Sequence, residues 1–289
     1  MKGSIVLIVI AGLLWGTTGL FTTFFGDAGL DPMQRTSIRT VFAAVAMASF
    51  LFFKDKKLFR ISFKNLLLCI AAGTVMYFTA LAYFLSIDAA SVPVAVVLMY
   101  TSPVMVMAFS VAFMGEKLTP LKGIAVVVML IGCVLVSGLV GDSSFSLWGF
   151  VFGLLSGVLY SAYNVITKFE MQRGLNPLTA STYAFITMGT VSLFFASPVV
   201  TAGALIEKPW PLIPLAVLFG IVTCTLPYLL YTMSLKKLPV GTAAALAVIE
   251  PMAATVFSVI VLHTLPSVFA WIGIALILGA VLLLAKSEG

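Results

Sequence analysis

The chain has 289 residues, of which 62% are hydrophobic and only 9% are charged, and its mean hydropathy is +1.19. A soluble protein of this length needs a charged surface that so few charged residues cannot build, so the composition excludes a soluble globular domain. The net charge is +6, but the basic residues form no continuous basic face, and we expect no nucleic-acid partner.

Apolar stretches of about twenty residues, the length that crosses a hydrocarbon core of about 30 Å as a helix, recur along nearly the whole chain. A helix also pairs its own backbone groups where water is absent. The sequence therefore predicts an all-α integral membrane protein. We expect ten transmembrane helices, at residues 4–24, 33–53, 64–85, 93–114, 122–140, 147–168, 178–200, 212–234, 241–262 and 268–285.

The basic residues predict the orientation of these spans. If the N-terminus is cytoplasmic and the spans alternate, all of the 16 lysines and arginines except Arg35, Arg39 and Lys208 lie on the inner side. Cytoplasmic loops are enriched in Lys and Arg, so we expect both termini in the cytoplasm and the chain in the cell (cytoplasmic) membrane. Trp148, Trp210 and Trp271 then fall at the outer interface.

The two halves of the chain match each other. A shift of 148 residues brings Pro103 onto Pro251 and residues 109–111 onto residues 257–259. Each half holds five predicted spans, and because five is odd the second half enters the membrane with opposite polarity. We therefore predict two inverted repeats, 1–140 and 147–289. Such repeats are a common route to alternating access, with the substrate site near the midplane.

Glycines occupy matching places in the first span of each half. Gly12 and Gly16 match Gly153 and Gly157 at a slightly smaller shift. Small residues spaced in this way let helix backbones approach each other closely. We interpret all four as structural contacts between helices.

Short motifs in chain order give the sequence a family resemblance. They are Leu14-Trp15-Gly16, Ile38-Arg39, Ser102-Pro103, Gly115-Glu116-Lys117-Leu118 and Glu250-Pro251. With them the chain resembles the drug/metabolite transporter superfamily, specifically its ten-helix EamA-type members. The resemblance implies a pseudosymmetric bundle with a central cavity and a secondary transporter of small organic solutes. In the second half, the box at 115–118 is replaced by His263-Thr264-Leu265-Pro266.

Glu250 is the first candidate for a substrate-binding residue. An ionisable group in a span costs at least ~2.5 kcal/mol and usually faces a polar cavity. The carboxyl could bind a cationic group or exchange a proton, so the proton is a candidate coupling ion, and we expect no other cofactor. The alternative is a structural acid that is hydrogen-bonded to a neighbouring helix.

Arg39 is the second candidate. It lies roughly six residues inside its span, a depth of about 9 Å at 1.5 Å per residue. An arginine fork suits a carboxylate, so we expect either an outer gate or a clamp on a substrate carboxylate. Snorkelling to the outer headgroups is the alternative for Arg39 and the interpretation that we favour for Arg35.

Aromatic and amide side chains in mid-span form a third group of candidates. A buried hydroxyl, indole N–H or amide needs a polar partner, which a cavity can offer. Packing is the alternative for each of the aromatic residues. The residues predicted to bind substrate in this group are Trp15, Tyr77, Tyr100, Tyr160 and Asn164, and Tyr163, Tyr228 and Tyr231 could line the cytoplasmic mouth.

The matched prolines predict gating or hinge positions. Pro103 and Pro251 cannot donate to the carbonyls of Met99 and Ala247, which are freed near the membrane centre. The three cysteines lie within spans without metal-ligand spacing, so we expect no metal site.

We expect a secondary transporter of an amino acid or similar metabolite that works by alternating access. The alternative cargo is a small organic or quaternary-ammonium cation such as choline, which an aromatic cage with Glu250 would suit. A membrane-embedded enzyme is less favoured because no nucleophile–base set or acid cluster is found. A passive channel is also less favoured, since inverted repeats with prolines suit gating. The expected partners are a small-molecule substrate and the lipid bilayer, and the expected state is a monomer.

Overall fold

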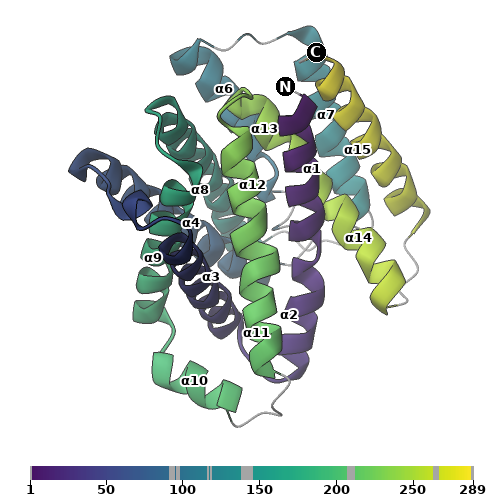
Figure 1. Cartoon of the computed structure of the whole chain (residues 1–289). Helices are drawn as coiled ribbons and strands as arrows, with labels where there is room; N and C mark the ends of the chain where they lie inside the picture. The colour runs from purple at the N-terminus through teal and green to yellow at the C-terminus, as the bar shows by residue number, and fades with distance from the viewer. Residues whose placement is uncertain are drawn as a thin grey trace.

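Every regular element in the described part of the chain is a helix. The computed structural model describes residues 2–90, 95, 98–115, 117, 119–137, 146–206, 212–262 and 267–287 (Figure 1). The elements are α1 (Lys2–Gly16), α2 (Thr18–Asp27), α3 (Pro32–Lys54), η1 (Lys56–Phe59), α4 (Phe63–Ala89), α6 (Ser102–Met114), α7 (Pro120–Ser137), α8 (Leu147–Gln172), α9 (Pro177–Phe195), α10 (Pro198–Ile206), α11 (Leu212–Gly220), η2 (Ile221–Thr225), α12 (Leu226–Ser234), α13 (Val240–Leu246), α14 (Ile249–Leu262) and α15 (Val268–Ser287).

Each of the ten predicted spans contains an apolar helix. Among the described residues, seven helices are long and apolar enough to cross a membrane: Gly3–Asp27, Met33–Lys54, Phe63–Ser86, Leu147–Gln172, Pro177–Phe195, Leu212–Ser234 and Val240–Val261. The predicted spans 93–114, 122–140 and 268–285 hold the shorter apolar helices Ser102–Met114, Pro120–Leu135 and Trp271–Leu283. The predicted all-α integral membrane fold is confirmed, and the chain is a multi-pass membrane protein.

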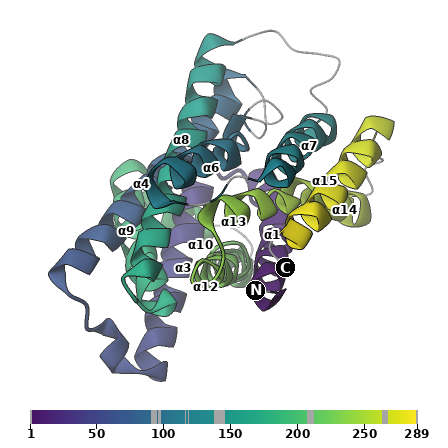
Figure 2. The ribbon, with the colours of Figure 1, turned by 90° about the horizontal axis from the view of Figure 1, so that it is seen from above.

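The two ends of the chain lie close together at one end of the bundle, as an even number of spans requires (Figures 1 and 2). The short helix α10 lies at the opposite end (Figure 1). Several residues that the sequence singled out lie outside the described residues: Glu116, Leu118, Lys208, Trp210 and 263–266.

Matching caps begin α3 and α9, the helices of the second predicted span in each half. The Asp31 side chain accepts hydrogen bonds from the backbone N–H groups of Met33 (2.8 Å) and Gln34 (2.9 Å), and the Asn176 side chain accepts one from Leu178 (2.9 Å). A proline follows the cap directly in both halves, where its fixed φ angle suits the first helical turn. The local signals that start α3 and α9 are therefore the same.

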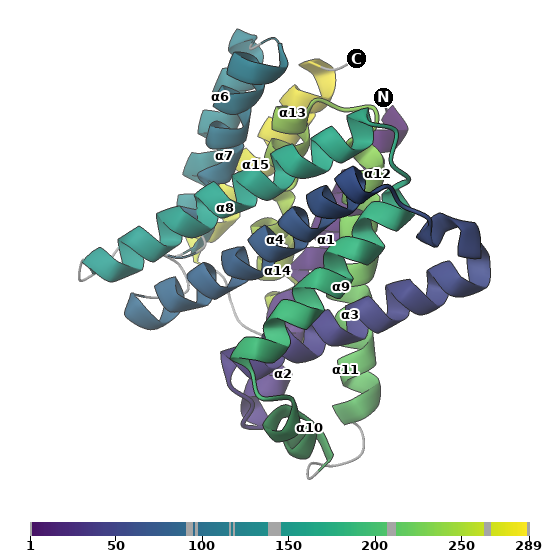
Figure 3. The ribbon, with the colours of Figure 1, turned by 90° about the vertical axis from the view of Figure 1, so that its left-hand side faces the viewer.

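Helix packing repeats when the two halves are exchanged. Helix α1 packs against α12 and α14, and its counterpart α8 packs against α4 and α6. The pairs α3 with α9 and α7 with α15 each join helices that hold the same place in the two halves (Figures 2 and 3). This is the packing expected of a two-fold repeat, while the repeat boundaries 1–140 and 147–289 stay a prediction.

The glycines of α1 and α8 make the close contacts that we predicted. A methyl group added to Gly16 would lie 2.6 Å from the Cβ of Ala253 in α14. A methyl group on Gly157 would lie 3.0 Å from both the Leu98 carbonyl oxygen and the Thr101 Oγ1, next to α6. Both distances leave no room for a side chain, so the structural interpretation of these glycines is confirmed.

A second glycine pair follows the same symmetry. Gly73 of α4 faces the backbone of Ala184 in α9, and Gly220 of α11 faces the Arg39 carbonyl oxygen in α3 at 3.0 Å from an added Cβ. Ala184 and Arg39 occupy corresponding positions in the two halves. Each of these two contacts therefore joins a glycine of one half to the backbone of the other half.

Replacing Gly73 with alanine is expected to destabilise the protein by about 1–3 kcal/mol, because overpacking a filled contact costs that much. The added methyl would lie 2.7 Å from Thr187 Cβ and 3.1 Å from the backbone carbon of Ala184. Thermal unfolding of the purified protein measures the effect. Gly279→Ala is the matched control, since a methyl there meets no described atom within 4 Å. Equal melting temperatures for the two variants would contradict this packing.

Candidate functional site

Both matched prolines lie just after an interruption in a membrane-spanning helix. Residues Tyr100 and Thr101 form a turn before α6, in which Pro103 is the second residue. Residues 247–248 form a turn between α13 and α14, and Pro251 follows in the first turn of α14. The ninth predicted span, 241–262, thus holds two helices joined by a turn.

The turn before Pro251 provides a hydrogen-bond donor for the backbone carbonyl of Ala247. The backbone N–H of Glu250 donates to the carbonyl of Ala247 at 3.1 Å, which is the acceptor that Pro251 cannot use. In the other half, the Thr101 hydroxyl donates to the Leu98 carbonyl at 2.6 Å. Non-helical backbone at this depth is tolerated where protein or a cavity surrounds it, so the two breaks mark the place to look for a site.

Glu250 is half-buried in the first turn of α14, where the helix N-terminus carries positive partial charge. The Tyr100 hydroxyl and the Arg39 guanidinium are within electrostatic range of its carboxyl. Tyr83 of α4 and Tyr160 of α8 are also within range of its carboxyl. Side chains from α3, α4, α8 and the turn before α6 therefore lie near this acid.

Arg39 faces the same space from α3. It is half-buried, its Nε has no hydrogen-bond partner among the described residues, and its Cζ lies 5.9 Å from the centre of the Phe219 ring. Cys224, Tyr228 and Glu250 are its electrostatic neighbours, but within the described chain Arg39 and Glu250 form no ion pair. The site thus holds two opposite charges that are not joined to each other.

Arg35, which lies one helical turn before Arg39, is hydrogen-bonded within the protein. Its Nη1 donates to the backbone carbonyl of Thr22 at 2.9 Å. This bond joins the start of α3 to α2, so Arg35 has a structural contact where we expected it to reach the headgroups.

Aromatic rings pack around the charged pair. Trp15 contacts Tyr228 edge to face at 4.8 Å between ring centres and Tyr231 at 5.8 Å. Tyr163 meets Tyr228 at 5.9 Å and stacks with Tyr160 at 6.3 Å. These contacts join α1, α8 and α12 beside the interrupted helices.

Three buried polar groups at this site have no hydrogen bond among the described residues. They are the Nε1 of Trp15, the hydroxyl of Tyr100 and the Oγ of Ser102. Ser102 occupies the position in the first half that Glu250 occupies in the second. Buried polar groups are usually satisfied, so these donors are open to a water molecule or a bound solute.

Two predicted residues stand outside this set. The Asn164 amide is used within the protein: it accepts a hydrogen bond from the Tyr231 hydroxyl and donates to the Tyr160 carbonyl at 2.8 Å. Tyr77 packs against Phe195 at 5.1 Å and belongs to an apolar cluster that also contains Tyr163 and contacts Tyr160 and Tyr228. The structure therefore brings together Glu250, Arg39, Trp15, Tyr100 and Tyr160, with Asn164 and Tyr77 used in packing behind them.

Tyr83 was not among the site residues that we predicted, although it corresponds to Tyr231 in the repeat. Tyr83, Tyr160, Tyr228, Arg39 and Glu250 keep accessible surface even though they face one another from five elements. These side chains form the candidate substrate site. In the described residues, no group of three or more His, Cys, Asp or Glu side chains could hold a metal ion.

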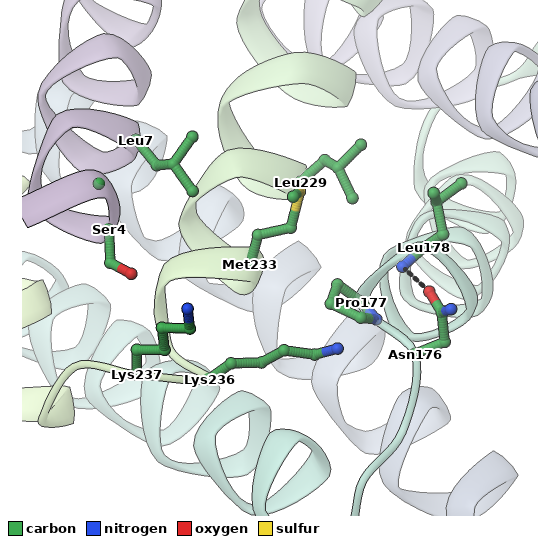
Figure 4. A pocket seen from close by; sticks show the side chains of 10 residues that line it. Ser4, Leu7, Asn176, Pro177, Leu178, Leu229, Met233, Lys236 and Lys237 are labelled. Atoms are coloured by element: carbon green, nitrogen blue, oxygen red, sulfur yellow. Dashed lines mark hydrogen bonds between the residues drawn. The ribbon is translucent and has the colours of Figure 1, made fainter. Parts of the chain in front are cut away.

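A cavity of about 540 Å³ lies at the end of the bundle that holds the chain termini (Figure 4). Ser4 and Leu7 of α1, Leu229 and Met233 of α12, and Pro177 of α9 line its walls. Lys236 extends toward Pro177 and Asn176 (Figure 4). None of the predicted site residues lines this cavity, so it is separate from the central site.

Opposite charges and aromatic rings meet at broken helices between two related halves, an arrangement that defines a membrane transporter. The sequence model of the EamA-like transporter family matches residues 2–138 and, a second time, residues 147–286. The chain belongs to this family.

Several relatives extend over almost the whole chain. It is 22% identical to the "Uncharacterized transporter YxxF" of Bacillus subtilis, over 99% of this chain and 91% of that protein. It is 26% identical to an "Uncharacterized transporter" of Archaeoglobus fulgidus, over 96% and 94%. A crystal structure aligns with a TM-score of 0.82 at 20% identity, over 100% of this chain and 98% of the other, which supports the fold.

Proposed function

We propose that this transporter moves an amino acid or a similar zwitterionic metabolite across the cytoplasmic membrane by alternating access. The observation that carries the proposal is the central pair Arg39 and Glu250, two opposite charges that share one space without an ion pair. A buried charge without a partner is costly, so a ligand that supplies both missing partners gains affinity.

A zwitterion fits this pair. The Arg39 guanidinium, whose Nε is unpartnered, suits a carboxylate. Glu250 accepts from an ammonium group while Tyr100 provides a hydroxyl beside it. The ring of Trp15 then packs against the rest of the solute.

The breaks before Pro103 and Pro251 support alternating access. They occur at matching places in the two halves, and α6, which follows the first break, packs against α13, which precedes the second. Tilting one half against the other would open the central site first to one side and then to the other. We propose the proton as the coupling ion, with Glu250 exchanging it.

The orientation rests on the distribution of lysine and arginine, which puts both termini in the cytoplasm. Single cysteines at positions 56 and 208, in a background without native cysteines, are expected to react with an impermeant reagent from opposite sides of the membrane. Reaction of both from one side would contradict the ten-span orientation.

The experiment that tests the cargo is a thermal-shift screen of the purified protein with the twenty amino acids and with choline. A ligand that binds only the folded state raises the melting temperature, and a tighter ligand at the same concentration raises it further. Stabilisation by an amino acid, followed by its uptake into proteoliposomes, supports the proposal. Stabilisation by choline alone favours the second candidate, a quaternary-ammonium cation, for which the cluster of Trp15, Tyr228 and Tyr231 offers aromatic faces.

A further inference from the structure

A second acid, Glu170, is buried within the bundle, far along α8 from the central site. The predicted sixth span ended at residue 168 and left Glu170 in a loop, but α8 continues to Gln172. Only 1% of Glu170 is exposed, and its Oε1 has no hydrogen-bond partner among the described residues. It is thus a carboxyl group withdrawn from water.

Its immediate neighbours are uncharged. The thiol of Cys69 in α4 lies within hydrogen-bonding reach of the carboxyl, and Tyr163 of α8 is within electrostatic range. The nearest lysine in sequence, Lys168, directs its Nζ to the carbonyls of Leu235 (2.9 Å) and Leu238 (2.6 Å). In the described chain, Glu170 therefore has no cation beside it.

The elements packed against α8 place no described charge beside Glu170. Among their described residues, α6 and α13 carry no titratable side chain. Helix α4 carries Cys69, Tyr77 and Tyr83, an exposed Lys64 in its first turn, and Asp88 near its other end. Helix α9 carries Tyr183, whose hydroxyl donates to the carbonyl of Phe59 at 2.8 Å. Helix α12 carries Tyr228 and Tyr231, which belong to the central aromatic cluster.

An ionised Glu170 would be unfavourable for two reasons. An unpaired charge in a buried place costs several kcal/mol. The last turn of a helix also carries negative partial charge, which repels a carboxylate. A proton removes both costs, since a carboxylic acid is neutral and gains an O–H donor.

We propose that Glu170 is a proton-binding site of this transporter. The carboxylate takes up one proton to become a carboxylic acid when the surrounding helices are closed, and it releases that proton to water when they separate. A proton is the ligand that this site suits, because among the described residues no second acid lies with Glu170 to coordinate a metal cation.

Contacts connect this site to the central one. Tyr163, which lies near Glu170, stacks with Tyr160 and meets Tyr228 edge to face. Tyr160 is within range of Glu250, and Tyr228 is within range of Arg39. Proton binding at Glu170 does not depend on the cargo, and only its coupling to transport rests on the proposed function.

Infrared spectroscopy of the purified protein at about pH 6 tests the proposal, since a glutamate with its ordinary pKa of about 4.3 is ionised at that pH. We expect Glu170→Gln to remove the carbonyl signal of one protonated carboxyl group. Asp27→Asn, which changes an exposed acid at the other end of the bundle, is expected to leave that signal unchanged. A wild-type spectrum from which Glu170→Gln removes no such signal would overturn the proposal.

If Glu170→Gln does not fold, a second variant can still test the proposal. Cys69→Ala keeps the acid but removes its thiol neighbour, so the frequency of the Glu170 signal is expected to shift. Glu250→Gln serves as the comparison, because it alters the central site and leaves the Glu170 signal in place. Loss of the Cys69-sensitive signal in Glu250→Gln would show that the protonated group is Glu250, and the proposal would be wrong even if the transport function holds.

Discussion

Glu250→Gln is expected to abolish transport by this protein while leaving it folded. The amide has nearly the same shape as the carboxyl, so the first turn of α14 and the contact with Tyr100 can persist. What disappears is the charge that faces Arg39 and that would hold an ammonium group or exchange a proton. Breaking a buried charge pair typically costs about 3–5 kcal/mol, which corresponds to a loss of about 100-fold or more in binding.

Uptake into proteoliposomes measures the loss of transport, and the melting temperature of the variant measures whether it stays folded. The melting temperature is expected to stay level or to rise, since the substitution removes a buried ionisable group. Asp27→Asn provides the matched loss of an exposed carboxylate, with transport near the wild-type rate. Unchanged uptake in Glu250→Gln at every pH would make this acid structural.

The sequence was sufficient to predict the bundle because each span is long, apolar and separated by charge. The matched spacing around Pro103 and Pro251 predicts a repeat, and the family model matches residues 2–138 and 147–286 separately. The sequence also placed the freed Ala247 carbonyl before Pro251, but it did not show that the helix ends there, because residues 247–248 lie in an apolar run without glycine. In the structure the chain turns at these residues, and α13 packs against α1 and α6.

Glu170 was missed for a related reason. Lys168 and Arg173 flank it in the sequence, so the segment has the composition of a cytoplasmic loop. In the structure, the Lys168 ammonium turns to the carbonyls at the end of the eighth span, and this lets α8 continue with Glu170 on its buried face. A charge count along the chain cannot distinguish these two outcomes.

Tyr77 and Tyr83 show why the sequence could not assign single side chains to the site. Both are tyrosines in α4, six residues apart, which separates them by about 240° around a helix with 3.6 residues per turn. Tyr77 packs on Phe195, whereas Tyr83 faces Glu250 and Arg39. Helix α4 is apolar on most of its surface, so its sequence gives no face that would tell which tyrosine reaches the site.

Arg39→Ala is expected to lower the affinity for a zwitterionic cargo by about 30-fold or more, since losing one partner of a buried charged contact costs about 2 kcal/mol or more. Affinity for choline is expected to stay nearly unchanged, because choline has no carboxylate for the guanidinium. Arg39→Lys is the control: it keeps the positive charge but loses the fork, so we expect an intermediate affinity for the zwitterion. Calorimetric titration of the hits from the thermal-shift screen gives these values.

Trp15→Ala also distinguishes the two cargo classes, the zwitterion and the permanent cation. For a permanent cation, losing a cage ring removes cation–π contact of about 0.5–2 kcal/mol and also opens the packing on Tyr228. For a zwitterion, the loss is expected to be smaller than that of Arg39→Ala, because the two charges hold the solute. A protein that loses choline affinity in Trp15→Ala, keeps it in Arg39→Ala and responds to no amino acid would carry a quaternary ammonium cation, and the zwitterion assignment would then be wrong.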